Sequence, residues 1–298
     1  MVARLGLSEE HVSENTLVIY HGGCFDGFTA AWAFRKLRPD VATTFRPAHH
    51  GERPPNVVGR DVYVLDFAYP RATMLEMAEG AARILVLDHH KTARDDLDGL
   101  PFCQFDMERS GAGIAWDYFA QGAQPRPWIV DIVEDRDLWR FRFGDETRWA
   151  MAYISSLPMT FESWDALVEA GLEQAVERGK AVQQYIDAYG EAACAHALFR
   201  DIGGHTVPVI NIPNMNCSEH IDRLRTKYPD YPFAASFFLR ADGVWQFSLR
   251  SAGSFDVSTI ARAFGGGGHR NASGFQSRVL PWDMERQPTS ESEDATEG

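Results

Sequence analysis

Three short apolar runs early in the chain predict strands that are buried inside a sheet. They cover residues 17–20, 62–65 and 84–87, and each is rich in branched aliphatic side chains. Each run is too short for an independent helix, and continuous apolar runs are typical of strands covered on both faces. Helical patterns fit between them, over 28–37 and from Pro70 to about Glu79. Alternating strands and helices predict a parallel sheet in an α/β domain.

The remainder of the chain changes from helical patterns to a second group of strands. Helices are expected over 110–119 and 128–134, and the long stretch 163–196 has few helix-breaking residues. Strands are expected over 207–210, 233–238 and 244–249, with an Asp-Gly turn signal before the last. We therefore predict an α/β fold with a parallel-sheet N-terminal domain, a helical connector and a smaller mixed α/β C-terminal domain. The expected boundaries are a disordered N-terminus at 1–15, the first domain at 16–162, the connector at 163–196, the second domain at 197–280 and an acidic disordered tail at 281–298.

Each of the three early strands ends in polar residues. His21 follows the first strand, Asp66 follows the second, and Asp88-His89-His90 follow the third. Ligands of open α/β sheets bind beyond the carboxyl ends of the strands, so these tips are expected to converge on one site. Any one of these side chains alone could be a helix cap or a satisfied polar group, but three tips at once favour a site.

The polar residues of the first domain form a ligand set suited to hard metal ions. The set comprises His21, Asp26, Asp66, Asp88, His89, His90 and Asp135. Carboxylates combined with imidazole suit Mn²⁺ or Mg²⁺ better than zinc, and two such cations about 3.5–4 Å apart could activate a water for attack at phosphorus. Asp66 is the candidate for the bridging carboxylate. Cys24 could add a soft ligand, or it is a small buried thiol.

A second candidate region is rich in glycine. Gly265 to Gly268 precede His269 directly, and small residues let a backbone approach a phosphate closely. Arg250 ends an expected strand, and its planar guanidinium suits phosphate. The pair His49-His50 could be a ligand pair, but its Pro-rich surroundings favour a surface loop.

Composition restricts the partners. The net charge is −13 and no basic stripe is present, so gripping long duplex DNA is not expected. No apolar stretch approaches the roughly 20 residues that span a bilayer, and the polar N-terminus does not read as a signal peptide. Four cysteines without a CxxC pair indicate reduced thiols and a cytoplasmic location.

The motifs together resemble the DHH phosphoesterase family, in the branch whose DHH-associated domain carries a GGGH motif. The matching segments are 21–27, 64–67, 88–90, 110–111, 134–137, 248–251 and 265–274. The resemblance implies a two-domain phosphodiesterase with a DHH metal-binding catalytic domain that holds two metal ions, usually Mn²⁺, with Mg²⁺ as the alternative. It implies metal ligation by His21, Asp26, Asp66, His89 and Asp135. It further implies that Asp88 orients a ligand and that His90 sits by the phosphate or supplies a proton.

The same resemblance assigns substrate binding to the second domain. The implied substrate contacts are Ser110 from the first domain, and Arg250, Gly266, Gly267, Gly268 and His269 from the second. The expected substrates are short oligonucleotides or dinucleotides, cleaved to 5′-mononucleotides in the manner of an oligoribonuclease or exonuclease. Dephosphorylation of 3′-phosphoadenosine 5′-phosphate is the close alternative, and a homodimer is compatible with the sequence.

One position departs from the family's first motif. The family commonly has Asp-x-Asp after the histidine, whereas Cys24 stands where the first aspartate falls. A thiolate binds Mn²⁺ less favourably than a carboxylate does. A nucleotide-binding regulatory protein with an impaired metal site is therefore the competing hypothesis, and manganese-dependent turnover separates the two.

Overall fold

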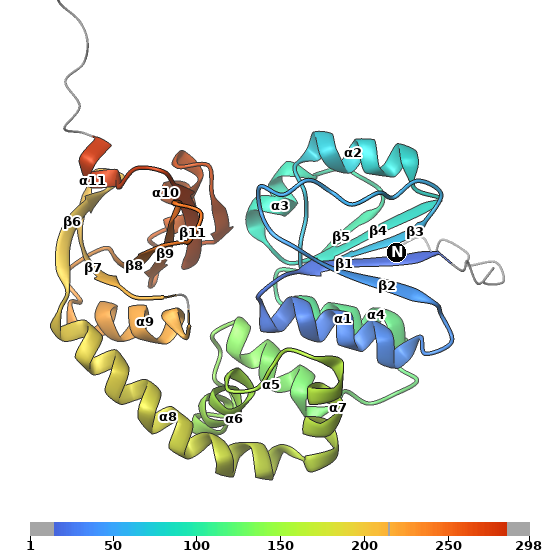
Figure 1. Cartoon of the computed structure of the whole chain (residues 1–298), viewed down its shortest axis with the longest axis horizontal. Coiled ribbons are helices and arrows are strands. Elements are labelled where there is room, and N and C mark those ends of the chain that lie inside the picture. Colours follow the sequence, from blue (N-terminus) through green and yellow to red (C-terminus); the bar gives the residue numbers. More distant parts are fainter. Residues whose placement is uncertain (1–14, 214, 285–298) are drawn as a thin grey trace, which may run out of the picture. The chain divides into compact units, whose positions relative to one another are not determined.

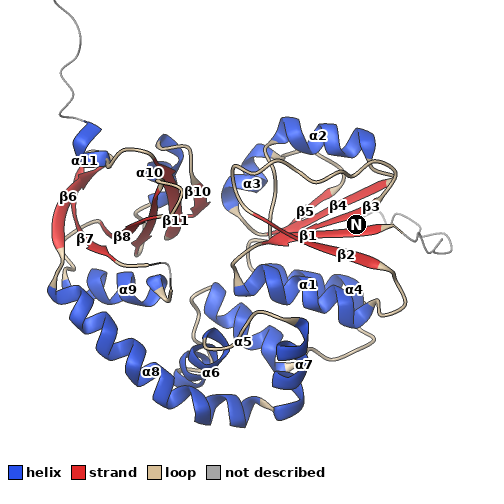
Figure 2. Ribbon diagram, viewed as in Figure 1, coloured by secondary structure: helices blue, strands red, loops and turns tan. Residues whose placement is uncertain are grey.

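The computed structural model describes residues 15–213 and 215–284, and the chain divides into two compact units between residues 183 and 184. Figures 1 and 2 show the elements of each unit. The first unit contains β1 (Thr16–His21), α1 (Phe25–Leu37), β2 (Thr43–Ala48), β3 (Asp61–Leu65), α2 (Arg71–Gly80), β4 (Arg83–Asp88), α3 (Lys91–Asp96), β5 (Cys103–Phe105), α4 (Gly111–Ala120), α5 (Trp128–Asp137), α6 (Asp145–Ser155) and α7 (Phe161–Ala170). Helix α8 (Leu172–Ala195) runs across the division. The second unit then contains β6 (Leu198–Ile202), β7 (His205–Asn211), α9 (Cys217–Lys227), β8 (Phe233–Leu239), β9 (Trp245–Ser251), α10 (Val257–Ala263), β10 (Gly267–His269), β11 (Ala272–Ser277) and α11 (Pro281–Met284).

The first unit is a fully parallel five-stranded sheet in the order β2-β1-β3-β4-β5. Helices α1 and α4 cover one face and α2 and α3 the other, as Figure 2 shows. Each face packs its own apolar core, one around Trp32 and Trp164 and the other around Met74 and Met77. The expected parallel α/β domain is confirmed.

The two edge strands of this sheet were not predicted from the sequence. In β2, buried positions are rare and Pro47 interrupts the apolar pattern, and β5 is very short. Edge strands are commonly short, polar or proline-containing, so they lack the continuous apolar run by which a central strand is recognised.

The second unit is a mixed sheet in the order β10-β11-β9-β8-β7-β6, with one parallel pair, β7 and β8. Its two faces carry separate cores, one with α10 and the other with α9. The expected smaller mixed α/β domain is confirmed. Within the described ranges, no helix combines the length and apolar character that crossing a bilayer requires.

The boundaries proposed from the sequence stay predictions, although the structure describes two of the segments concerned. The stretch expected to be one connecting helix is broken at Gly171, where φ is +85°, and Trp164 of α7 is fully buried in the first unit. At the other end, Trp282 of α11 packs on Phe237, with ring centroids 5.1 Å apart, although 281 was expected to begin a disordered tail. Residues 285–298, and 1–14 at the N-terminus, lie outside the described residues.

Candidate active site

The carboxyl edge of the first sheet brings together the polar residues that follow its strands. Strands β1, β3 and β4 are neighbours, so His21, Asp66 and His89 leave the sheet side by side. The Nδ1 atom of His21 lies 3.5 Å from Asp66 Oδ2, and His89 Nε2 lies 3.1 Å from Asp66 Oδ1. Asp66 is 1% exposed and therefore stands at the buried centre of the site.

The candidate metal ligands form two adjacent groups. His21, Asp66 and His90 form one group, in which the ligand atoms all lie within 4.8 Å of one another. Asp26, His89 and Asp137 form a second group by the same measure. The short distance between Asp66 and His89 joins the two groups. The two groups of ligand atoms are therefore adjacent, and Asp66 of the first group lies next to His89 of the second.

Helix α4 holds Asp26 by its N-terminus. The backbone amides of Gly111 and Ala112 both donate to the Asp26 carboxylate, at 2.5 and 2.9 Å. The first amides of a helix have no partner inside the helix and carry partial positive charge, so they bind a carboxylate well. Two helix amides thus fix the orientation of Asp26.

Gly111 is required by close packing. A Cβ atom at this position would lie 2.4 Å from Asp66 Cβ, far inside van der Waals contact. The glycine therefore lets the N-terminus of α4 reach Asp26 and Asp66 together.

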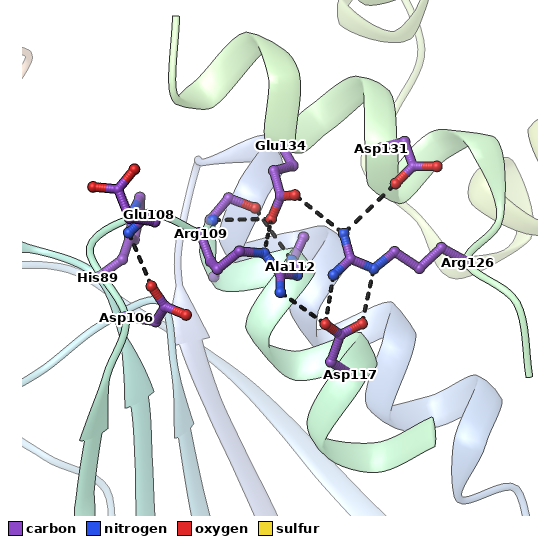
Figure 3. Close-up of polar contacts among 12 residues, drawn as sticks. His89, Asp106, Glu108, Arg109, Ala112, Asp117, Arg126, Asp131 and Glu134 are labelled. Carbon is purple, nitrogen blue, oxygen red and sulfur yellow. Dashed lines mark hydrogen bonds and ion pairs between the residues drawn. The ribbon is translucent and has the colours of Figure 1, made fainter. Parts of the chain in front are cut away.

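A polar network around the buried Glu134 fixes the turn that leads into α4 (Figure 3). Glu134 of α5 is 3% exposed and accepts hydrogen bonds from Arg109 Nε at 2.9 Å and Arg126 Nη1 at 3.1 Å. Its carboxylate also accepts from the backbone amide of Ser110, at 3.2 Å. Asp117 binds both arginines on the other side. These contacts tie α5 to the start of α4, and so support the position of Asp26.

The expected metal ligand Asp135 does not lie in either group, and Asp137 takes that place. The Asp135 carboxylate accepts from the backbone amide of Arg142 at 2.9 Å and from Thr147 Oγ1 at 2.6 Å. It therefore holds the loop between α5 and α6. Asp137 Oδ2 lies 3.5 Å from His89 Nε2 instead. Residues two apart on a helix point about 200° apart, so only one of them can face the sheet edge.

Ser110 has a part other than the one expected, whereas the part of Cys24 stays a prediction. The Ser110 hydroxyl is fully buried and caps α4 by accepting from the Gly113 amide at 3.2 Å, so it is not accessible to a substrate. Serine is a favoured N-cap because its hydroxyl satisfies such an amide. Cys24 is the N-cap residue of α1, without a side-chain capping bond, and it is absent from the groups of ligand atoms found among the described residues.

The site contains several buried carboxylates close together, which need positive charge to balance them. Burial raises the pKa of Asp26 well above its usual range, and repulsion from Asp66 and Asp137 adds to this. Burial also opposes ionisation of Asp66, but contacts with His21 and His89 more than offset it, and its pKa lies well below normal. The pKa of His89 is raised well above normal because nearby carboxylates, Asp66 first, outweigh the effect of burial. Several buried carboxylates in contact are stable only when cations or protons compensate them.

These residues fit a pair of divalent metal ions. The two oxygens of the buried Asp66 face the imidazole nitrogens of His21 and His89, but neither oxygen has a hydrogen bond of good geometry among the described residues. A buried carboxylate without well-formed hydrogen bonds is unfavourable unless something else satisfies it. The surrounding mixture of carboxylate oxygen and imidazole nitrogen is a donor set that Mn²⁺ and Mg²⁺ accept.

The second histidine of the Asp88-His89-His90 sequence is held in place. Asp88 is fully buried, and one of its oxygens lies 2.7 Å from His90 Nδ1. A carboxylate on one ring nitrogen fixes the orientation of an imidazole whose other nitrogen acts elsewhere.

One residue that lies beside the site, His50, was not predicted to be there from the sequence. His50 was expected to be part of a surface loop, and it is indeed exposed. Its ring centroid nevertheless lies 5.7 Å from that of His21 and 5.0 Å from that of Phe67. Although part of the residue is exposed, the groups around the imidazole desolvate it and lower its pKa to about 4, and His21 and His90 lower it further. The signal available in the sequence was the His-His pair itself.

In the second unit, two of the predicted substrate residues, Arg250 and His269, lie on one row of the sheet. Strand pairing sets His269 opposite Ala272, and Ala272 opposite Arg250. Directly opposed residues of neighbouring strands point to the same face, so Arg250 and His269 share a face. The Arg250 guanidinium donates to Ser218 Oγ on α9, which holds it.

The glycine run is an edge strand of this sheet. Gly267 and Gly268 belong to β10 and pair with β11, and Gly266 directly precedes the strand. A Cβ atom at Gly266 would lie 2.1 Å from the carbonyl oxygen of Gly274, and Gly268 has φ +131°. The hairpin therefore needs glycine for its own packing, and phosphate binding by these residues stays a prediction.

Comparison with known proteins gives a family match in the second unit. Residues 201–285 match the DHHA1 domain. A protein of Acanthamoeba polyphaga mimivirus, named as uncharacterized, is 29% identical over 286 residues, which cover 87% of this chain and 66% of the viral protein. This chain therefore spans less than two thirds of that relative's length, by a small margin.

Two solved structures share the fold over most of the chain. The DHH domain of a protein described as a member of the s1p family of ribosomal proteins has a TM-score of 0.52 at 12% identity, covering 88% of this chain and 82% of its own. RecJ from Thermus thermophilus, solved in complex with Mn²⁺, has a TM-score of 0.50 at 15% identity, covering 88% of this chain and 49% of its own.

Proposed function

We propose that this chain, whose residues 201–285 match the DHHA1 domain and whose fold is shared with DHH-domain structures, is a DHH-family phosphoesterase. We propose further that it hydrolyses phosphodiester bonds of short oligonucleotides or dinucleotides to 5′-mononucleotides. The observation that supports the proposal most strongly is the pair of adjacent ligand groups that meet at the buried Asp66 carboxylate, which lies between the imidazoles of His21 and His89. Two divalent ions, most favourably Mn²⁺, would be held by His21, Asp66 and His90 and by Asp26, His89 and Asp137. Such ions supply charge stabilisation at phosphorus and an activated water.

The remaining residues would bind and orient the substrate. Asp88 holds His90 Nδ1, so the other ring nitrogen of His90 has two alternative parts. It either ligates the first ion, or leaves that ion to His21 and Asp66 and hydrogen-bonds a phosphate oxygen or transfers a proton to the leaving group. Arg250 and His269 share one face of the second sheet and suit a second phosphate contact.

A short substrate fits the charge of the chain. The net charge is −13, so long-range attraction of a polyanion is absent and binding depends on a few placed cations and metals. The manganese bound by the Thermus RecJ supports Mn²⁺ as the first ion to test. A cytoplasmic location and a homodimer stay predictions.

The first experiment is turnover of a 5′-labelled dinucleotide with Mn²⁺, with Mg²⁺ or with EDTA, the products being separated by chromatography. We expect release of 5′-mononucleotide with Mn²⁺ and none with EDTA. The matched variant is Asp66→Asn, because Asn also tolerates the left-handed backbone at this position, where φ is +55°. It should lower kcat at least about 100-fold while the protein stays folded.

Other outcomes would change the proposal. Wild-type turnover by Asp66→Asn would rule out the two-ion assignment. Release of inorganic phosphate from 3′-phosphoadenosine 5′-phosphate, without diester cleavage, would make the protein a phosphomonoesterase. Nucleotide binding without any turnover would favour a regulatory protein.

A further inference from the structure

Two histidines follow strand β2 at the same edge of the sheet as the metal-ligand groups. Strand β2 pairs in parallel with β1, and the register sets Ala48 opposite His21. The chain therefore leaves β2 directly beside His21, and His49 and His50 are the first residues of the turn.

Local contacts hold this turn against the end of β1. The Gly22 amide donates to the carbonyl oxygen of Ala48 at 2.9 Å. The Glu52 carboxylate accepts from the His49 amide at 3.2 Å, and the Glu52 amide donates to the His49 carbonyl at 3.1 Å. The His49 ring lies over Gly22, where an added Cβ would come within 2.7 Å of it. His50 is therefore presented from a turn with a defined position.

The His50 ring stands just outside the first ligand group. It contacts the rings of His21 and Phe67, at 5.7 and 5.0 Å between ring centroids. Since it is absent from the group of His21, Asp66 and His90, whose ligand atoms lie within 4.8 Å of one another, it is too distant to share an ion with all three as placed. An exposed imidazole beside His21, Asp66 and His90 can instead contact a substrate bound at that group.

We propose that His50 is a substrate-contacting residue, whose imidazole donates a hydrogen bond to a phosphate oxygen of the substrate. This inference rests on the proposed function, and it assigns the site a phosphate contact from the turn after β2. A neutral imidazole offers a single N–H donor. One neutral hydrogen bond to a ligand is typically worth a few-fold to about tenfold in affinity.

The test combines kinetics with two binding measurements on the full chain. The variants are His50→Ala, which removes the donor, and His50→Gln, which keeps an N–H donor. His49→Gln is the matched control, since it changes the same residue type one position earlier in the turn. For each protein we would measure kcat and KM with the dinucleotide, and by calorimetry the affinity for Mn²⁺ and, in the Mn²⁺-loaded protein, for 5′-AMP.

His50→Ala should raise KM and weaken 5′-AMP binding by roughly 3- to 10-fold, with kcat changed by less than about threefold. Mn²⁺ affinity should stay as in the wild type, His50→Gln should recover part of the loss, and His49→Gln should behave as the wild type does.

Different results would overturn the part proposed for His50 and the proposed function. Weaker Mn²⁺ binding by His50→Ala would make His50 a metal ligand and overturn the inference, and so would unchanged KM and unchanged 5′-AMP affinity. If the wild-type protein cleaves no diester, the proposed function fails, while 5′-AMP binding still decides whether His50 contacts phosphate.

Discussion

Asp135 and Asp137 stand two residues apart near the end of α5, yet the fold uses them differently. Asp137 faces His89 at 3.5 Å, while Asp135 accepts hydrogen bonds from the loop that follows the helix. Because Asp137 would contribute charge to a metal ion, we expect Asp137→Asn to weaken Mn²⁺ binding at least about tenfold and to reduce turnover with it. Calorimetric titration with Mn²⁺ measures this directly, and unchanged affinity would remove Asp137 from the ligand set.

Asp135→Asn should act on stability instead. The variant keeps the shape of the side chain but weakens the bonds to Arg142 and Thr147, which we expect to cost about 1–3 kcal/mol of unfolding free energy. Chemical denaturation measures the loss, with Mn²⁺ affinity as the control. A stable Asp135→Asn protein that no longer bound Mn²⁺ would instead restore Asp135 as a ligand.

Cys24 is the other residue whose part depends on the metal. Burial raises the pKa of its thiol well above normal, and Asp66 and Asp137 raise it further, so without a cation the thiol stays neutral. Cys24→Asp should therefore increase affinity for Mn²⁺ and decrease affinity for the thiol-preferring ion Cd²⁺. Titration of the wild-type and Cys24→Asp proteins with Mn²⁺ and with Cd²⁺ tests this. If the two proteins have the same affinities for both ions, Cys24 binds neither ion.

At the scale of elements, the N-terminus of α4 is the part of the first unit that positions the site. It reaches Asp26 with two backbone amides and leaves no room for a side chain at Gly111. Gly111→Ala should therefore displace Asp66 or the helix, and weaken Mn²⁺ binding at least about tenfold.

The control for this variant is Gly80→Ala at the end of α2. An added Cβ there would meet its nearest neighbours, Val57 and Val58, at 3.7 Å, which is ordinary contact. We expect this protein to bind Mn²⁺ as the wild type does. Equal Mn²⁺ affinity for the Gly111→Ala protein would show that close packing at α4 is not needed for the site.

At the scale of the whole molecule, the two units should respond differently to metal. The ligand groups formed by His21, Asp66 and His90 and by Asp26, His89 and Asp137 lie in the first unit. Ligand binding stabilises the folded state by about 2.7 kcal/mol at a free concentration 100 times Kd. We therefore expect Mn²⁺ to slow hydrogen exchange in peptides of β1, β3 and the start of α4, and EDTA to reverse the effect.

Peptides of β7, β8 and β9 provide the internal control, since they belong to the second unit. The Asp66→Asn protein should lose the protection by Mn²⁺ in the first unit. Protection spread equally over both units, or retained in Asp66→Asn, would contradict binding at these groups.

The sequence by itself determined the central strands and the convergence of their polar ends. Continuous apolar runs can only be buried, and in a parallel sheet their carboxyl ends meet at one edge, so His21, Asp66 and His89 follow from the linear order of residues. In the second unit the sequence predicted β7, β8 and β9, with an Asp-Gly turn signal before the last, but not β6, β10 and β11.

Only the tertiary structure decided which of several suitable side chains reach the site. Asp135 and Asp137 are chemically equal, and the direction in which α5 meets the sheet edge selects Asp137. Ser110 became a helix cap because α4 begins there, and His50 came beside His21 because β2 pairs with β1. These outcomes depend on packing between segments far apart in the chain, and local sequence patterns do not encode such packing.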